Sequence, residues 1–127
     1  MEIRVEQDII DGLIAMAADA APLECCGLLL GDVGRIDSLC MARNVHHRPR
    51  THFEIDPQIL IDTHRRAREG GPPIAGYYHS HPAGPARPSA TDREMSHGDG
   101  MIWAIIGQGK VTFWLDTAGG FRSLAVK

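Results

Sequence analysis

The chain has 127 residues, of which 43% are hydrophobic and 23% are charged. These are ordinary values for a globular protein, and they exclude a disordered tail, a collagen or a coiled coil. The formal net charge of −3 at pH 7 provides no basic footprint for nucleic acid. We therefore expect one globular domain over residues 1–127, without a nucleic-acid partner.

The sequence pattern also indicates no membrane or export signal. Apolar runs such as residues 101–106 are far shorter than the ~18 residues that suggest a membrane span. The N-terminus reads Met-Glu-Ile-Arg-Val-Glu and lacks the apolar stretch of a secretory signal. The three cysteines are an odd number and make a poor disulfide framework. We expect a cytoplasmic protein with no membrane partner.

Hydrophobic periodicity predicts a succession of strands and helices. The strands show alternating or continuous short apolar runs bounded by glycine and proline, whereas apolar residues recur every three or four positions in the helices. In chain order the expected elements are a strand at 3–5, a helix from 7 to the residues before Pro22, strands at 24–31 and 35–44, an extended piece at 53–55, a helix from 57 to about 69, a strand at 74–81, a short helix from 89 to about 97, and strands at 101–106, 111–115 and 121–126.

The start of the second helix is the best-defined boundary. Asp56 offers an oxygen that can accept from an unpaired backbone N–H, and Pro57 suits the first helical position. Gly70-Gly71-Pro72 ends this helix. Because strands and helices are interspersed without an internal repeat, we expect an α/β fold with a mixed central β-sheet flanked by helices.

Charge is distributed unevenly along the chain. Residues 1–37 contain eight acidic and two basic side chains, whereas residues 43–68 contain six arginines and three acids. Four histidines also fall within the second segment, namely His46, His47, His52 and His64. The simplest interpretation is a solvated loop and helix face. The alternative is a docking surface for an acidic protein partner.

A histidine pair at the end of a predicted strand is the strongest chemical signal. His79 and His81 are two positions apart, so their side chains project to the same face of a strand. Asp92 follows eleven residues after His81, in the first turn of the next predicted helix. Two imidazole nitrogens and a carboxylate oxygen suit zinc, and three protein ligands are typical of a catalytic zinc site.

Simpler roles exist for the same residues. Ser89 and Asp92 have the spacing of a helix N-terminus, where the serine caps the backbone and the aspartate favours the helix dipole. His79 and His81 could be ordinary surface histidines in a histidine-rich chain. However, the pattern His-x-His-x7-Ser-x2-Asp fixes four positions at once, which favours a metal site.

These motifs resemble a known family. Glu24, followed far downstream by His79-Ser80-His81-Pro82 and Ser89-Ala90-Thr91-Asp92, is similar to the motif of the JAMM (MPN-plus) zinc metallopeptidases. Residues 22–31 resemble the strand that carries the family's catalytic glutamate. Asn44 and residues 53–57 resemble the segment before the second helix in short prokaryotic members. The resemblance covers nearly the whole chain, and it implies the compact MPN fold, which has a cytidine-deaminase-like architecture.

The resemblance implies a role for each motif residue. His79, His81 and Asp92 would bind Zn²⁺, and Glu24 would take a proton from water and pass it to the leaving amine. Ser89 would donate a hydrogen bond to the oxyanion of the tetrahedral intermediate while also capping the helix. Without the resemblance, Glu24 would be interpreted only as an exposed acid at the start of a strand.

The resemblance also implies a class of substrate. The family hydrolyses amide or isopeptide bonds after the C-terminal Gly-Gly of ubiquitin-like proteins. Short prokaryotic members resemble enzymes that process ubiquitin-like sulfur carriers, for example by freeing a cysteine or a tail from the carrier's C-terminus. We therefore expect a zinc metallopeptidase or isopeptidase. Its carrier, its leaving group and its oligomeric state stay open at this point.

Three alternative functions have weaker support in the sequence. A cysteine hydrolase would use Cys25 or Cys26 with one of the motif histidines as its base, but Cys26 lies in an apolar run and nothing local supports a reactive thiol. A zinc deaminase would need His-x-Glu followed by Pro-Cys-x-x-Cys, and neither pattern occurs. A non-catalytic scaffold would correspond to family members that have lost the metal, but those lack ligands that this chain keeps.

Overall fold

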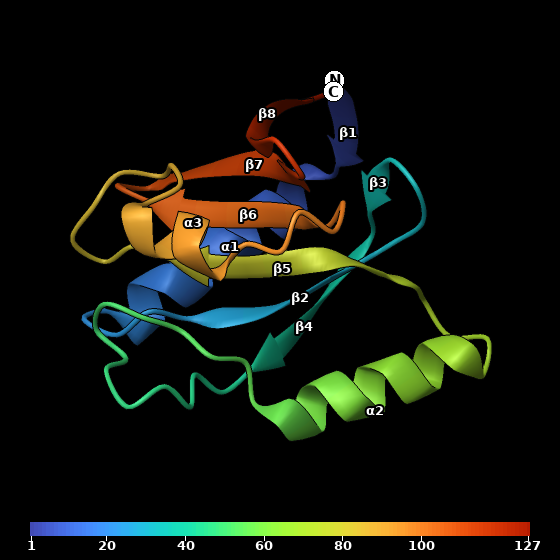
Figure 1. Ribbon diagram of the computed structural model, residues 1–127, viewed down its shortest axis with the longest axis horizontal. Coiled ribbons are helices and arrows are strands. Elements are labelled where there is room, and N and C mark those ends of the chain that lie inside the picture. The colour runs from blue at the N-terminus through green and yellow to red at the C-terminus, as the bar shows by residue number, and fades with distance from the viewer.

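The computed structural model describes residues 1–127 and shows a single eight-stranded sheet with three helices (Figure 1). In chain order the elements are β1 (Glu2–Val5), α1 (Gln7–Ala20), β2 (Cys26–Leu30), β3 (Arg35–Ile36), β4 (Ser38–Ala42), α2 (Pro57–Arg68), β5 (Ile74–Ser80), α3 (Ala90–Met95), β6 (Ile102–Gly107), β7 (Lys110–Thr117) and β8 (Gly120–Val126).

The sheet is mixed, as predicted. Its strand order is β3-β1-β8-β7-β6-β5-β2-β4. The interior strand β5 runs parallel to β6 and antiparallel to β2, and β1 runs parallel to both β8 and β3. Figure 1 shows α1 behind this sheet and α3 in front of it. The expected α/β class with helices against a mixed sheet is therefore confirmed.

Both faces of the sheet are covered at β2, which explains the continuous apolar run in this strand. Leu29 faces a core cluster that includes Leu13 of α1. Leu28 and Leu30 face a second cluster, against which Leu60 of α2 packs. Side chains alternate between the faces of a strand, so a strand that is covered on both sides needs apolar residues at every position.

One predicted strand is divided in the structure. Instead of one strand over 35–44, Arg35–Ile36 pairs with β1, whereas Ser38–Ala42 pairs with β2. Asp37 lies between them, and its N–H donates to the carbonyl of Leu30 at 2.8 Å. The chain therefore passes from one edge of the sheet to the other within a single residue, which hydrophobic periodicity does not reveal.

The third helix is shorter than predicted and ends at Met95. The side chain of Asp116 on β7 accepts from the N–H of His97 at 3.0 Å and from the N–H of Gly98 at 3.2 Å. These bonds draw the backbone after Met95 toward β7, so the residues up to His97 do not continue the helix. The predicted start of α2 is confirmed, because the side chain of Asp56 accepts from the N–H of Gln58 at 3.0 Å.

None of the three helices has the length and apolarity that crossing a membrane would require.

Close contact between β5 and β6 makes Gly76 a sensitive position. A Cβ at Gly76 would collide with the backbone of Ile102, so we expect Gly76→Ala to lower the free energy of unfolding by about 3 kcal/mol. Gly12→Ala is the matched control, because a Cβ at Gly12 in α1 meets no atom within 4 Å. That change should raise stability by about 0.5–1 kcal/mol. Urea denaturation of both variants measures the difference, and equal stabilities would contradict the packing described for β5.

Candidate metal centre

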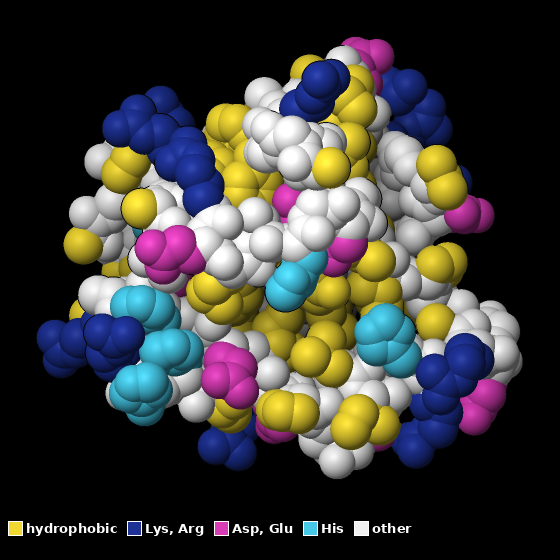
Figure 2. Space-filling view, in the orientation of Figure 1, with side chains coloured by type: hydrophobic (Ala, Val, Ile, Leu, Met, Phe, Trp, Pro, Cys, Tyr) yellow, Lys and Arg dark blue, Asp and Glu magenta, His cyan; other side chains and the backbone are white.

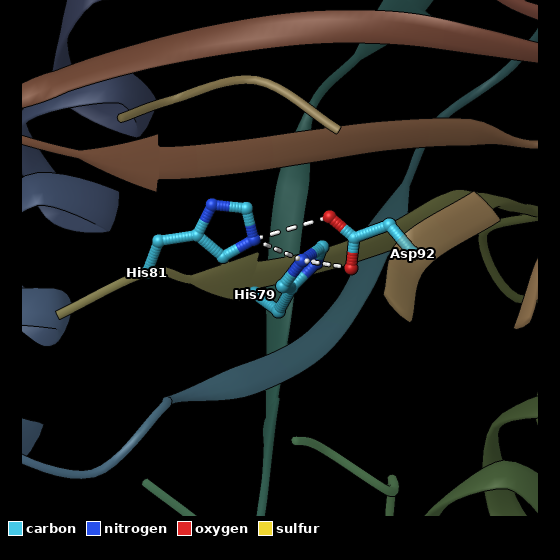
Figure 3. A group of neighbouring side chains, drawn as sticks. All are labelled: His79, His81 and Asp92. Atoms are coloured by element: carbon cyan, nitrogen blue, oxygen red, sulfur yellow. Dashed lines mark hydrogen bonds and ion pairs between the residues drawn. The ribbon is translucent and has the colours of Figure 1, made fainter. Parts of the chain in front are cut away.

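The motif residues meet where β5 ends. His79 lies near the end of β5, between β2 and β6, and His81 directly follows this strand. Asp92 lies in the first turn of α3. Figure 3 shows the two imidazole rings and the carboxylate pointing toward one another. The structure thus brings together the three residues that the sequence predicted as metal ligands.

The three side chains present their donor atoms at the spacing of a metal site. The Nε2 atoms of His79 and His81 are 3.1 Å apart. The carboxylate oxygens of Asp92 lie 2.9 Å from Nε2 of His79 and 3.1 Å from Nε2 of His81. Bonds of ~2.0–2.1 Å to a tetrahedral zinc ion would place donor atoms about 3.3 Å apart. The group therefore fits a metal ion, and no other cluster of three such residues in the chain does.

Aromatic packing holds the ring of His79. This residue is 0% exposed, and its ring stacks on Phe53 with centroids 4.3 Å apart. Trp103 meets the ring edge-on, with centroids 5.6 Å apart. Nδ1 of His79 is buried and has no hydrogen-bond partner. The orientation of this imidazole thus depends on its apolar neighbours.

A backbone carbonyl orients His81. Its Nδ1 lies 2.9 Å from the carbonyl oxygen of Pro85. A carbonyl oxygen only accepts, so Nδ1 carries the proton in this contact. With the proton on Nδ1, the neutral ring leaves the lone pair of Nε2 for a metal ion, whereas the protonated ring donates from Nε2 to the carboxylate of Asp92.

Asp92 and Ser89 form the capping box of α3. The hydroxyl of Ser89 accepts from the N–H of Asp92 at 3.1 Å, and the carboxylate of Asp92 accepts from the N–H of Ser89 at 3.0 Å. The simpler role considered for both residues is therefore real, and it coexists with the contacts of Asp92 to the two histidines. The hydroxyl proton of Ser89 is left free, because its cap uses only an oxygen lone pair.

Burial and hydrogen bonds set the charges of the group. Burial opposes the charge on Asp92, but hydrogen bonds from His79 and His81 outweigh it and hold the pKa of this carboxyl far below its usual range. Burial lowers the pKa of His79. Burial also disfavours the charged form of His81, yet its contacts with Asp92 and Pro85 raise the pKa of this residue.

Glu24 is buried beside this group. It is 7% exposed, which contradicts the interpretation of an exposed acid. Burial raises its pKa to about 7, although the positive charge on His81 opposes this shift. Glu24, His81 and Ser89 line one cleft of about 380 Å³. A carboxylate with a pKa near neutrality in such a cleft can both accept and return a proton.

Long-range hydrogen bonds fix the backbone at Glu24. Its N–H donates to the carbonyl of Pro49 at 2.8 Å, and its carbonyl accepts from the amide of Asn44 at 3.0 Å. The N–H of the next residue, Cys25, donates to the hydroxyl of Ser80 at 2.8 Å. Ser80 therefore links Glu24 to the strand that carries His79.

Asn44 and Ser80 are the positioning residues that sequence reasoning missed. The Asn44 side chain also donates to the carbonyl of His52 and accepts from the N–H groups of His46 and Glu54, so it fastens the loop before α2. Ser80 offered a signal, since a polar residue between two histidines on a buried strand needs a partner on the opposite face. Asn44 belonged to the segment that carried the family resemblance, but its role could not be predicted because its partners lie on other segments.

The cysteines show no sign of activation. Burial raises the pKa of Cys25, and it raises the pKa of Cys26 to about 12. Both thiols therefore stay protonated at neutral pH, whereas a nucleophilic cysteine needs a lowered pKa. The alternative of a cysteine hydrolase finds no support in this environment.

Comparisons with known proteins agree with this geometry. Residues 6–117 match the family described as prokaryotic homologs of the JAB domain. A desampylase from Haloferax volcanii is 32% identical over 126 residues, which cover 94% of this chain and 91% of the relative. A probable TtuB-protein conjugate cleaving protease from Thermus thermophilus is 39% identical over 74 residues, or 57% of this chain and 48% of that protein.

The fold also has a counterpart of known structure. A JAB1/MPN domain protein from Archaeoglobus fulgidus aligns with a TM-score of 0.65 and 18% identity, covering 99% of this chain and 97% of the other. This likeness concerns the fold alone, and it agrees with the expected MPN architecture. Because the family match spans most of the sequence, this chain belongs to the family of prokaryotic homologs of the JAB domain.

Proposed function

We propose that this hydrolase cleaves, with zinc, the amide bond that follows the C-terminal Gly-Gly of a ubiquitin-like protein or sulfur carrier. The observation that carries the proposal is the convergence of three donor atoms, all within 4.8 Å of one another, beside a buried glutamate with a pKa of about 7. One relative is named for cleaving protein conjugates, which agrees with this class of substrate.

His79, His81 and Asp92 are the proposed ligands. Their fit rests on two imidazole nitrogens 3.1 Å apart and on a carboxylate whose two oxygens lie 2.9 Å from Nε2 of His79 and 3.1 Å from Nε2 of His81. A zinc ion held by three protein ligands supplies a polarised water molecule with a pKa near 7.

Glu24 is the proposed general base and acid. It takes a proton from the attacking water while the water oxygen bonds to the carbonyl carbon, and it delivers a proton to the amine as the C–N bond breaks. The products are a carboxylate and a protonated amine. A pKa of about 7 suits both transfers at neutral pH. Ser89 is the proposed donor to the oxyanion, through the hydroxyl proton that its helix cap leaves free.

The geometry favours a substrate tail without side chains near the scissile bond. β5 is an interior strand with β2 and β6 on its two sides, so a tail cannot pair with it as an added strand. The tail would instead lie against the loops that line the cleft, which include Arg50, Thr51 and residues 82–85. Glycine allows a backbone carbonyl to approach such a recessed site closely.

Part of the arginine-rich segment lies near this cleft. Arg50 lines the cleft itself, whereas Arg65, Arg66 and Arg68 lie in the last turn of α2, about 18 Å along that helix from its start. His46 stacks on both His47 and His52, with ring centroids 4.6 and 4.7 Å apart. Figure 2 shows histidines gathered beside basic side chains at the left of the molecule. We propose residues 43–52 as the docking surface for an acidic carrier and leave the end of α2 out of it.

Zinc content tests the ligands. We expect about one zinc ion per chain in the wild type and a large loss in His81→Ala and Asp92→Ala, because each change removes one of three donors. His64→Ala is the control, since this histidine is exposed on α2. Elemental analysis after dialysis gives the occupancy. Full occupancy in both ligand variants would refute the assignment.

The role of Glu24 is tested by Glu24→Gln. The amide keeps the size of the side chain but cannot accept the proton, so turnover should fall about 10²-fold or more while zinc content stays unchanged. Steady-state kinetics and elemental analysis on the same preparation measure both properties. Glu69→Gln, an exposed acid after α2, should retain full turnover. An active Glu24→Gln variant would show that another group moves the proton.

Substrate specificity is tested with a ubiquitin-like carrier that has a C-terminal extension after Gly-Gly. Mass spectrometry should locate the cut directly after the second glycine. Replacing that glycine by valine should abolish cleavage, a chelator should stop it, and added salt should slow it. Cleavage that ignores the Gly-Gly sequence, or that resists chelation, would exclude the proposed activity.

A further inference from the structure

Two arginines share the cleft with the candidate catalytic residues. Arg50 and Arg87 line the same cleft of about 380 Å³ as Glu24, His81 and Ser89. Both arginines are exposed, and neither belongs to an ion pair within the chain. Their guanidinium groups are therefore free to bind an anion that enters this cleft.

The backbone places each arginine close to one residue of the site. Pro49, which precedes Arg50, accepts the N–H of Glu24 through its carbonyl at 2.8 Å. The carbonyl of Pro85 is 2.9 Å from Nδ1 of His81 and also accepts the N–H of Arg87 at 2.9 Å. Each arginine thus lies on a loop that is bonded directly to Glu24 or to His81.

The loop that carries Arg87 is also held from its other side. The hydroxyl of Thr112 on β7 donates to the carbonyl of Ala86 at 2.6 Å. Three prolines, at positions 82, 85 and 88, restrict the same loop further. Because this backbone is fixed, a long side chain at position 87 starts from a defined point beside the cleft.

The acids of the cleft favour a cation beside the position of an anionic ligand. Glu24 lines the cleft, and the carboxylate of Asp92 lies within 3.1 Å of His81, which lines it too. Both acids would repel a carboxylate in the substrate. A guanidinium offers a planar pair of donors that matches a carboxylate, so Arg50 and Arg87 can offset this repulsion and orient the anion.

The leaving group decides whether such an anion is present. In a single amino acid attached through its α-amine, the free carboxyl carbon lies about 2.5 Å from the scissile nitrogen. In an isopeptide, the leaving amine is the side chain of a lysine within a protein. Its own carbonyl lies six bonds away and carries no charge because it belongs to the next peptide bond. Only the first kind of leaving group offers a carboxylate inside the cleft.

We propose that Arg50 and Arg87 bind the free α-carboxylate of a single amino acid that follows Gly-Gly, so that the enzyme prefers amino-acid adducts of its carrier to lysine conjugates. This inference rests on the proposed function and specifies its leaving group. The two arginines are specificity-determining residues, and the proton transfer remains with Glu24.

The test compares two semisynthetic carriers that end in Gly-Gly-Ala, one with a free carboxylate and one with a carboxamide. We expect the wild type to hydrolyse the acid at least about tenfold more efficiently in kcat/KM, because a charge-assisted hydrogen bond is lost in the amide. Arg50→Gln and Arg87→Gln should each reduce this preference, and the double variant should abolish it. Arg122→Gln, an exposed arginine on β8, is the matched control and should keep it.

A binding measurement separates this inference from the proposed function. Calorimetric titration of the Glu24→Gln protein with each carrier should show tighter binding of the acid, and the preference should vanish when both arginines are also replaced. The inference would be overturned if the wild type hydrolysed the acid and the amide with equal kcat/KM. It would also be overturned if the arginine variants lost activity toward both carriers to the same extent. If the wild type cleaves neither carrier but the Glu24→Gln protein still binds the acid more tightly, the proposed function fails and the role of the arginines stands.

Discussion

The candidate site depends on the hydrogen bonds that surround the buried carboxylate of Asp92. The residue is only 3% exposed, and an unpaired charge at such a depth would cost much free energy. Two imidazole nitrogens and the N–H of Ser89 surround this carboxylate. Because the bond from Ser89 also begins α3, one group fixes both the start of the helix and the point where the histidine rings converge.

The rest of the site is assembled by two loops that contain proline. The carbonyl of Pro49 holds the backbone of Glu24, and the carbonyl of Pro85 orients the ring of His81. Each loop also presents an arginine to the cleft. The proposed roles in proton transfer and in recognition of the leaving group are therefore linked through these two loops. Because these loops are already held in place, less conformational entropy is lost when a substrate binds.

Local sequence signals predicted much of the fold because they report short-range physics. The alternation at β1, the spacing of α1 and the Asp56-Pro57 start of α2 depend on neighbours within one or two turns. The expected strand over 35–44 was wrong because Arg35–Ile36 pairs with β1, whereas Ser38–Ala42 pairs with β2. The end of α3 was misplaced because Asp116 on β7 captures the following N–H groups. Both errors arise from partners outside the local sequence, since Arg35 pairs with Arg4 and His97 bonds to Asp116.

The sequence by itself determined the kinds of donor atom and their spacing, since the pattern from His79 to Asp92 needs only a strand end and the next helix start. Family resemblance added Glu24, which has no local signal. Only the tertiary structure decided that Glu24 is buried and has a pKa of about 7, and that Asn44 and Ser80 hold its backbone. It alone placed Arg50 and Arg87 in one cleft. The physical reason is that burial and hydrogen bonds between segments 20–60 residues apart exist only after the strands have paired.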